Sequence, residues 1–233
     1  MKGSGTMLRH LKKLLSRQVP TSPAHSLEAA FMTILHIDSS ILGGYSVSRA
    51  LSADIVAKLK ALHPGAKVIY RDLVADAALH LSDRHMAVFQ GGAADRALGT
   101  DLATGSAYID DLFAADIIVI GAPMYNFSIP SQLKGWIDRV VVAGRTFKYG
   151  ANGPESLLPA GKKVFIASSR GGVYTGDSPA RSLEHHETYL RGVLSFIGLT
   201  DITVIRAEGL SLGDEAKTAS VTKAKAEIAA LVA

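Results

Sequence analysis

The sequence of 233 residues contains no cysteine. This absence excludes disulfides, thiolate nucleophiles, zinc ribbons and cysteine-ligated iron–sulfur clusters, and it agrees with a reducing cytoplasm. Long hydrophobic runs are also lacking, because the longest ones, residues 117–124 and 140–144, are far shorter than the ~20 residues that cross a bilayer. We therefore expect a cytoplasmic protein without a membrane span.

Outside the first residues, the chain also lacks an excess of charge of either sign. Its formal net charge is +4, but residues 1–31 alone carry five basic side chains against the single acid Glu28. Subtracting these from the 25 basic and 21 acidic residues of the chain leaves 20 of each. A basic surface for a nucleic-acid backbone would survive removal of a tail. The composition therefore predicts no nucleic-acid partner.

Residues 1–31 differ in pattern from the remainder of the chain. The stretch "LRHLKKLLSRQ" has the basic amphipathic pattern of a membrane-surface or targeting segment, and "MKGSGT" is typical of an added linker. We favour an added leader or an upstream start before Met32, because the domain pattern begins cleanly at Thr33. The chain is expected to consist of this extension and one domain, residues 32–233.

From residue 33 onward, short β-branched runs alternate with longer helical patterns, which is typical of a parallel sheet covered on both faces. The expected strands are residues 33–38, 66–73, 116–123, 162–169 and 201–209. The expected helices are residues 46–63, 100–115, 131–144, 182–198 and 214–232. With right-handed crossovers, the pattern predicts an α/β fold: a three-layer, doubly wound sandwich with a five-stranded parallel sheet.

Some finer expectations accompany this pattern. Residues 74–99 are expected to be mostly loop, Ser131 is expected to cap its helix, and Gly198 is expected to end another. Trp136 is expected to be packed. Adjacent histidines on a helix diverge by ~100°, so His185–His186 is expected to lie on a solvated helix face and to bind no metal.

Ligands of such sheets bind outside the carboxyl ends of the strands, and the loop after the first strand, "DSSILGGYSVSR", is rich in hydroxyls. Ser40, Ser46 and Ser48, with free N–H groups at the start of the next helix, could hold a phosphate. The loop matches neither the Walker nor the dinucleotide glycine pattern, so a single terminal phosphate fits better. The alternative is an ordinary serine-capped turn.

The loop after the third strand, "PMYNFSIP", combines aromatic, amide and thioether side chains. Tyr125 and Phe127 could form the walls around a planar ring, with Met124 as a soft filler. Asn126 offers a donor and an acceptor for the edge of a heterocycle. The alternative is that these side chains fill the core or an interface.

The loop after the fourth strand, "SSRGGVYTGDSP", contains Gly171–Gly172, which would let the backbone approach a ligand closely. Arg170 or the loop N–H groups could stabilise negative charge on a ring, and the alternative is a flexible glycine loop. Together, the three loops describe a ligand with a phosphate at one end and a flat hydrogen-bonding ring at the other. Flavin mononucleotide (FMN) has this form.

The stretches "SSILGGYSVSR", "APMYNFSIPSQLKGWIDRV", "GRTFKYGANGPESLL" and "GKKVFIASSRGG" also resemble, in order and spacing, the bacterial FMN-dependent NADH:azoreductase family, which reduces quinones as well. The resemblance covers about residues 32–233. It implies a flavodoxin-like fold with the sheet order 2-1-3-4-5 and a homodimer.

The resemblance also implies which residues bind the cofactor. The phosphate would be held by Ser40, Ser46, Val47 and Ser48. The isoalloxazine would be lined by Met124, Tyr125, Asn126 and Phe127, and its pyrimidine side by Ser169, Arg170, Gly171 and Gly172. Substrate-pocket walls would be Phe147, Tyr149 and Phe196. Two features depart from the family: Val47 can offer only its N–H to the phosphate, and Asp38 precedes the loop, which would weaken anion binding slightly.

The reaction that the resemblance implies is ping-pong transfer of two electrons from NADH or NADPH, through FMN, to an azo compound or quinone. Because the cofactor carries the chemistry, no catalytic side chain is expected. A dedicated quinone reductase, a flavodoxin-type electron carrier and a flavin-free interaction module remain alternatives. Such carriers are usually strongly acidic, whereas residues 32–233 carry no net charge. The sequence does not distinguish NADH from NADPH, nor identify the physiological acceptor.

Overall fold

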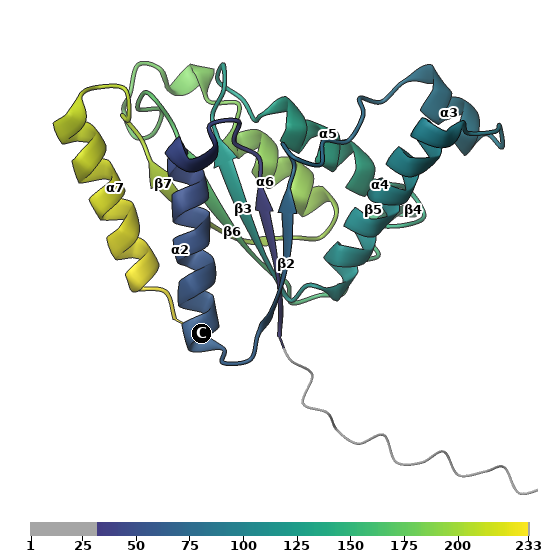
Figure 1. The fold of residues 1–233 in the computed structure, drawn as a ribbon, viewed down its shortest axis with the longest axis horizontal. Helices are drawn as coiled ribbons and strands as arrows, with labels where there is room; N and C mark the ends of the chain where they lie inside the picture. The colour runs from purple at the N-terminus through teal and green to yellow at the C-terminus, as the bar shows by residue number, and fades with distance from the viewer. Residues whose placement is uncertain (1–31, 233) are drawn as a thin grey trace, which may run out of the picture. The chain divides into compact units, whose positions relative to one another are not determined.

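In the computed structural model, which describes residues 32–232, five parallel strands form one sheet in the order β2-β1-β3-β6-β7 (Figure 1). They are β1 (Thr33–Asp38), β2 (Lys67–Asp72), β3 (Ile117–Pro123), β6 (Lys163–Ser169) and β7 (Asp201–Ala207). Counted along the chain, this is the expected order 2-1-3-4-5, which is therefore confirmed. The leader predicted for residues 1–31 lies outside the described residues.

The helices cover both faces of the sheet, as Figure 1 shows. One face carries α2 (Val47–Leu62) and α7 (Asp214–Ala229). The other carries α4 (Arg96–Ala114), α5 (Ser131–Val140) and α6 (Glu187–Phe196). The three-layer α/β sandwich predicted from the alternating pattern is thus confirmed. None of the helices in the described part of the chain is long and apolar enough to cross a bilayer.

Two apolar cores hold these layers together. Leu51 and Ile55 of α2 pack with Ala224 and Ile228 of α7 on one side of the sheet. The other core is larger and contains Trp136, which is buried as predicted. Because parallel strands are buried on both faces, they need continuous apolar runs, and every residue of β3 is buried.

The register of the strands determines where their loops emerge. Asp38 at the end of β1 pairs with Gly121, and Pro123 at the end of β3 pairs with Ser169 at the end of β6. The loops after these three strands therefore leave the sheet at the same edge. This edge is the place where a doubly wound sheet binds its ligand.

The segment expected to be mostly loop, residues 74–99, contains more structure than predicted. Helix α3 (Asp83–Phe89) lies inside it, and α4 begins at Arg96 rather than at residue 100. Ser82 and His85 form a capping box at the start of α3, while the Asp95 carboxylate accepts the Leu98 N–H at 2.9 Å. A helix as short as α3 shows no clear apolar period, so its capping residues were the only sequence feature that indicated a helix here.

The helix expected over residues 131–144 ends at Val140. The Thr146 hydroxyl accepts the Val142 N–H at 3.1 Å and donates to the Val140 carbonyl oxygen at 2.5 Å, which replaces the helical hydrogen bonds there. A short antiparallel hairpin that the sequence analysis missed follows, formed by β4 (Phe147–Gly150) and β5 (Gly153–Ser156). The predicted cap at Ser131 is wrong, because Pro130 occupies that position.

The helix expected over residues 182–198 is also shorter than predicted. A 3₁₀ turn, η2 (Arg181–Leu183), precedes α6, whose first N–H groups donate to the Glu184 carboxylate. His186 lies before the helix and is fully buried, so the expectation of a solvated helix face is wrong for it. Gly198 ends this region with a φ of +90°, as predicted for a C-terminal glycine.

Candidate functional site

The three predicted loops meet at the carboxyl edge of the sheet, and Tyr125 connects two of them. Its hydroxyl lies 3.2 Å from Ser40 Oγ and accepts the Ile41 N–H at 3.2 Å. The Met124 N–H donates to the Ser169 carbonyl oxygen at 2.8 Å, which joins the third loop to the second. The structure therefore brings the serine, aromatic and glycine loops into one site.

The serine loop ends at the N-terminus of α2. Ser46 is the N-cap, its Oγ accepting the Arg49 N–H at 3.2 Å and lying 3.0 Å from Ser48 Oγ. The first N–H groups of a helix, here those of Val47 and Ser48, have no acceptor within the helix. Apart from its two chain neighbours, no described residue has an atom within 4 Å of a Cβ built on Gly43. This open cradle, with hydroxyls and free N–H groups, fits a phosphate.

Asp38 was expected to weaken anion binding, but the structure neutralises it locally. The carboxylate is buried and accepts hydrogen bonds from Ser52 Oγ at 2.8 Å and Tyr70 Oη at 3.1 Å. Arg49 Nη1 lies 3.7 Å away. Burial and the Asp38 charge raise the pKa of Tyr70 to about 12, so this phenol stays a hydrogen-bond donor.

Arg49 is a site residue that the sequence analysis missed. Its guanidinium donates to the Ser40 carbonyl oxygen at 3.0 and 2.8 Å and forms a two-pronged pair with Asp72 at 2.9 and 2.7 Å. The hydrogen bonds to Asp72 raise the pKa of Arg49. Arg49 thereby fixes the backbone of the serine loop against the edge strand β2. The sequence feature that could have indicated this role is the position of the arginine, three residues after the Ser46 cap.

The aromatic loop is a strained hairpin turn. Tyr125 and Ser128 exchange backbone hydrogen bonds of 2.9 and 3.1 Å, and between them Asn126 and Phe127 have φ values of +47° and +72°. Two-residue turns of this kind usually carry Asn-Gly, because a residue with a Cβ is disfavoured at positive φ. Phe127 is nevertheless there, and 42% of its surface is exposed. Strain that displays an aromatic ring is typical of a binding loop.

The glycine loop leaves little space for side chains at its two glycines. A Cβ on Gly171 would come within 2.8 Å of Ser211 Oγ, and one on Gly172 within 3.1 Å of the Tyr174 hydroxyl oxygen. The carbonyl oxygens of both residues accept backbone N–H groups from residues 209 and 211, but neither N–H donates to any backbone carbonyl of the described residues. Two such donors beside the aromatic loop could meet an acceptor atom of a bound ring.

Arg170 takes a different place from the one expected. Its guanidinium is fully buried, with Nε donating to Ser168 Oγ at 3.0 Å, Nη1 to Glu208 at 3.2 Å and Nη2 to Glu187 at 3.1 Å. Its backbone N–H donates to the Ala207 carbonyl oxygen at 2.8 Å. We therefore reassign the Arg170 side chain from ring contact to support of the glycine loop.

The three aromatic residues predicted as substrate-pocket walls form a cluster of their own. The Phe147 ring lies 4.7 Å from that of Phe196 and 5.3 Å from that of Tyr149. Phe147 is buried and belongs to the core, whereas Tyr149 is 75% exposed. No hydrogen bond or ring contact within the described residues connects these rings to residues 124–127.

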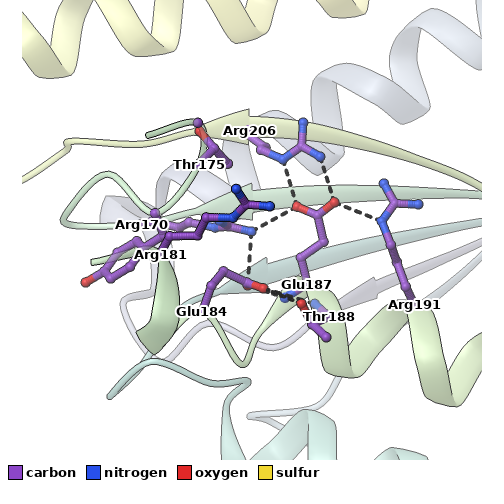
Figure 2. Close-up of a pocket in the computed structure, with 10 residues that line it drawn as sticks. Arg170, Thr175, Arg181, Glu184, Glu187, Thr188, Arg191 and Arg206 are labelled. Atoms are coloured by element: carbon purple, nitrogen blue, oxygen red, sulfur yellow. Dashed lines mark hydrogen bonds and ion pairs between the residues drawn. The ribbon is translucent and has the colours of Figure 1, made fainter. Parts of the chain in front are cut away.

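A polar pocket of about 370 Å³ lies behind the glycine loop, and Figure 2 shows its side chains. It shares only Arg170 with the predicted site. Its walls come from the loop after β6, the segment before α6, α6 itself and β7, with the residues Arg170, Tyr174, Thr175, Gly176, Arg181, Glu184, Glu187, Thr188, Arg191 and Arg206. Sequence reasoning missed this pocket, because its charges come from segments that only the fold brings together.

Glu187 is the anionic centre of that pocket. Its two oxygens accept hydrogen bonds from Arg206 at 2.7 and 2.6 Å, from Arg191 at 2.8 Å and from Arg170 at 3.1 Å. Burial favours the neutral acid, but the hydrogen bonds from Arg206 and Arg191 outweigh it and lower the pKa of Glu187 to about 2. This carboxylate therefore stays charged and orients the arginines around it.

Comparison with known proteins places this geometry in context. Residues 32–232 match the family model described as "Flavodoxin-like fold". The chain is 54% identical over 184 residues to the FMN-dependent NADH:quinone oxidoreductase 2 of Bradyrhizobium diazoefficiens, covering 79% of this chain and 91% of that protein. It is 53% identical to the enzyme of the same activity from Sinorhizobium fredii, covering 85% and 96%. A solved azoreductase from Bacillus anthracis superposes with a TM-score of 0.76 at 26% identity, covering 85% and 97%.

Proposed function

The chain belongs to the flavodoxin-like fold family, and from this premise we propose that it is an FMN-dependent oxidoreductase that passes two electrons from NADH to quinones and azo compounds. The observation that carries the proposal is identity of about half of all residues, over nearly the full length of relatives named FMN-dependent NADH:quinone oxidoreductase. The three loops gathered at one sheet edge support it, since they fit a phosphate and a flat ring.

We propose the cofactor contacts that the family resemblance implies, and the meeting of the three loops at one sheet edge supports them. Ser40, Ser46, Val47 and Ser48 would hold the phosphate, Met124, Tyr125, Asn126 and Phe127 the ring, and Ser169, Gly171 and Gly172 its pyrimidine side. Arg170 would act indirectly, by fixing the glycine loop. Phe147, Tyr149 and Phe196, whose rings form one cluster, are the proposed substrate contacts.

Bound FMN would supply the hydride acceptor and the two-electron donor that no side chain offers. The protein would hold the FMN in place and stabilise the charges on its phosphate and its ring. The positive end of α2 and the N–H groups of Val47 and Ser48 favour a doubly charged phosphate. The N–H groups of Gly171 and Gly172 would stabilise negative charge that develops on the ring. Phe127, exposed on its strained turn, offers a flat apolar surface against which successive substrates could pack.

Quinones are the better-supported acceptors, because the relatives at about half identity are named for them and the azoreductase structure is only 26% identical. A dedicated quinone reductase is therefore the second candidate. NADH as the donor follows from the names of the same relatives. A homodimer in the cytoplasm is also part of the proposal, and sedimentation of the holoenzyme tests the dimer.

The proposal is tested by an absorbance spectrum followed by turnover. Purified protein should bind FMN, turn yellow, and bleach when NADH is added without oxygen. It should then reoxidise with a quinone or an azo dye and no partner protein, whereas a flavodoxin-type carrier would need one. Turnover as kcat/KM with both acceptors separates the azoreductase from the dedicated quinone reductase. Colourless protein that takes up no FMN would contradict the flavin proposal.

The Phe127→Gly variant tests the strained turn. Glycine suits a positive φ, so the apo protein should keep its free energy of unfolding or gain about 1 kcal/mol. FMN affinity should fall about tenfold, because the aromatic contact with the ring is lost. Urea unfolding of the apo protein and FMN titration measure the two effects, with Phe127→Tyr as the control that keeps both ring and strain. Unchanged FMN affinity would show that Phe127 does not contact the cofactor.

A further inference from the structure

The polar pocket of Figure 2 carries an unbalanced positive charge. Four arginines, Arg170, Arg181, Arg191 and Arg206, face the three carboxylates of Glu184, Glu187 and Glu208. All but one of these arginines have a carboxylate partner. The exception is Arg181, which lines the pocket and whose side chain has no hydrogen bond or ion pair with any described residue.

The other arginines are held in place with donors to spare. Arg206 uses Nε and Nη2 on Glu187, and Arg191 uses Nε on Glu187 and Nη1 on the Ile202 carbonyl oxygen. Each guanidinium carries five N–H donors, so Arg206 Nη1 and Arg191 Nη2 keep N–H groups without a partner among the described residues. Oriented guanidinium groups of this kind match the oxygens of a phosphate.

The pocket adjoins the aromatic loop through Tyr174. The Tyr174 ring, which lines the pocket, meets the Phe127 ring edge-on at 6.2 Å between centroids. The His185 N–H donates to the Phe127 carbonyl oxygen at 3.1 Å, and Ser128 Oγ donates to the His185 carbonyl oxygen at 3.3 Å. A ligand with one flat end on the proposed ring site could therefore place a charged group in the pocket.

We propose that this pocket binds the diphosphate of the reduced nicotinamide dinucleotide, with Arg181 as its main contact and Arg191 and Arg206 as supporting donors. The inference rests on the proposed function, because it supposes that the nicotinamide lies against the flavin ring. It gives the diphosphate a site separate from the N-terminus of α2, where the flavin phosphate is expected. The arginines of the pocket also explain how a chain without a dinucleotide glycine pattern could hold NADH.

The test uses the full-length holoenzyme, an Arg181→Gln variant, and donors that differ only in phosphate. NADH has the diphosphate, reduced nicotinamide mononucleotide has one phosphate, and reduced nicotinamide riboside has none. The variant should raise the KM for NADH about fivefold with kcat unchanged, the modest effect of a solvent-exposed charge pair. The KM for the riboside should not change. Inorganic phosphate should compete with NADH in the wild type and less so in the variant.

Two further variants serve as controls. Lys223→Gln, on α7 at the other face of the sheet, removes the same charge from an exposed side chain and should leave all three donors unaffected. Arg181→Lys keeps the charge and should give an intermediate KM for NADH. FMN content, measured by absorbance, identifies any variant that has lost the cofactor.

Several outcomes would overturn the inference. One is an unchanged KM for NADH in Arg181→Gln, and another is an equal rise for the riboside. A larger rise for NADPH than for NADH would assign the pocket to the 2′-phosphate, and a rise confined to a sulfonated azo acceptor would assign it to the acceptor. If the wild-type holoenzyme oxidised none of the three donors, the proposed function itself would fail, which is a distinct result.

Discussion

Replacing Arg170 with methionine should lower the free energy of unfolding by about 3–5 kcal/mol, the usual cost of removing one partner from a buried ion pair. The Arg170 guanidinium is fully buried and contacts Glu187 and Glu208 at 3.1 and 3.2 Å. Methionine fills much of the same volume, so the loss arises from uncompensated carboxylates. The glycine loop should loosen at the same time, and FMN affinity should fall with it.

Urea unfolding of the apo protein at about neutral pH measures the first effect. Arg191→Met is the matched control: it removes another arginine from Glu187, but its side chain is 42% exposed, and the expected loss is below about 1 kcal/mol. Equal stability of the two variants would show that Arg170 does not support the loop. Loss of FMN affinity without loss of stability would restore the original interpretation of Arg170 as a ring contact.

Acid should destabilise the protein in two phases. His186 leads the first, and Glu187 leads the second together with Asp72, Asp101 and Glu184, whose pKa values hydrogen bonds also lower despite burial. His186 is fully buried. Burial, reinforced by the Arg170 charge, lowers its pKa from 6.5 to about 4. Because the unfolded chain binds this proton first, stability is lost as pH falls from 6.5 towards 4. The shift corresponds to about 3 kcal/mol at most.

Glu187 acts at lower pH. Its pKa falls from 4.5 in the unfolded chain to about 2 in the folded protein, so its contribution is present above 4.5 and lost as pH falls towards 2. Urea unfolding across this range should show both losses. In a His186→Leu variant the decline between 6.5 and 4 should flatten, while the later one persists. A variant whose stability falls as steeply as that of the wild type in the upper range would exclude His186 as the cause.

The fold followed from the sequence because its signal is repeated along the chain. Each parallel strand is a short β-branched run such as residues 117–123, and such runs are needed wherever a strand is buried on both faces. The boundaries failed where one side chain replaced a helical hydrogen bond. Thr146 ended α5 early and Glu184 shortened α6, and neither substitution changes the apolar pattern.

The meeting of the three loops at one sheet edge was predictable, but the contacts that each of their side chains makes were not. The Ser46 cap and the glycines at 171 and 172 were readable, because helix starts and close backbone approaches need particular residue types. The role of Arg170 could not be predicted from the sequence, because its partner Glu208 lies 38 positions away. The two residues meet only through the pairing of β6 with β7. Pairs of this kind require the three-dimensional structure.

The packing of α2 against α7 has a consequence for synthesis of the chain. Leu51 and Ile55 of α2 are made early, but Ala224 and Ile228, which complete their core, belong to the last helix of the sheet domain. A ribosome therefore releases nearly the whole chain before this apolar face can be covered. During that interval the face is open to other chains and to chaperones. The core between α2 and α7 is therefore completed only after the last helix of the sheet domain has been made.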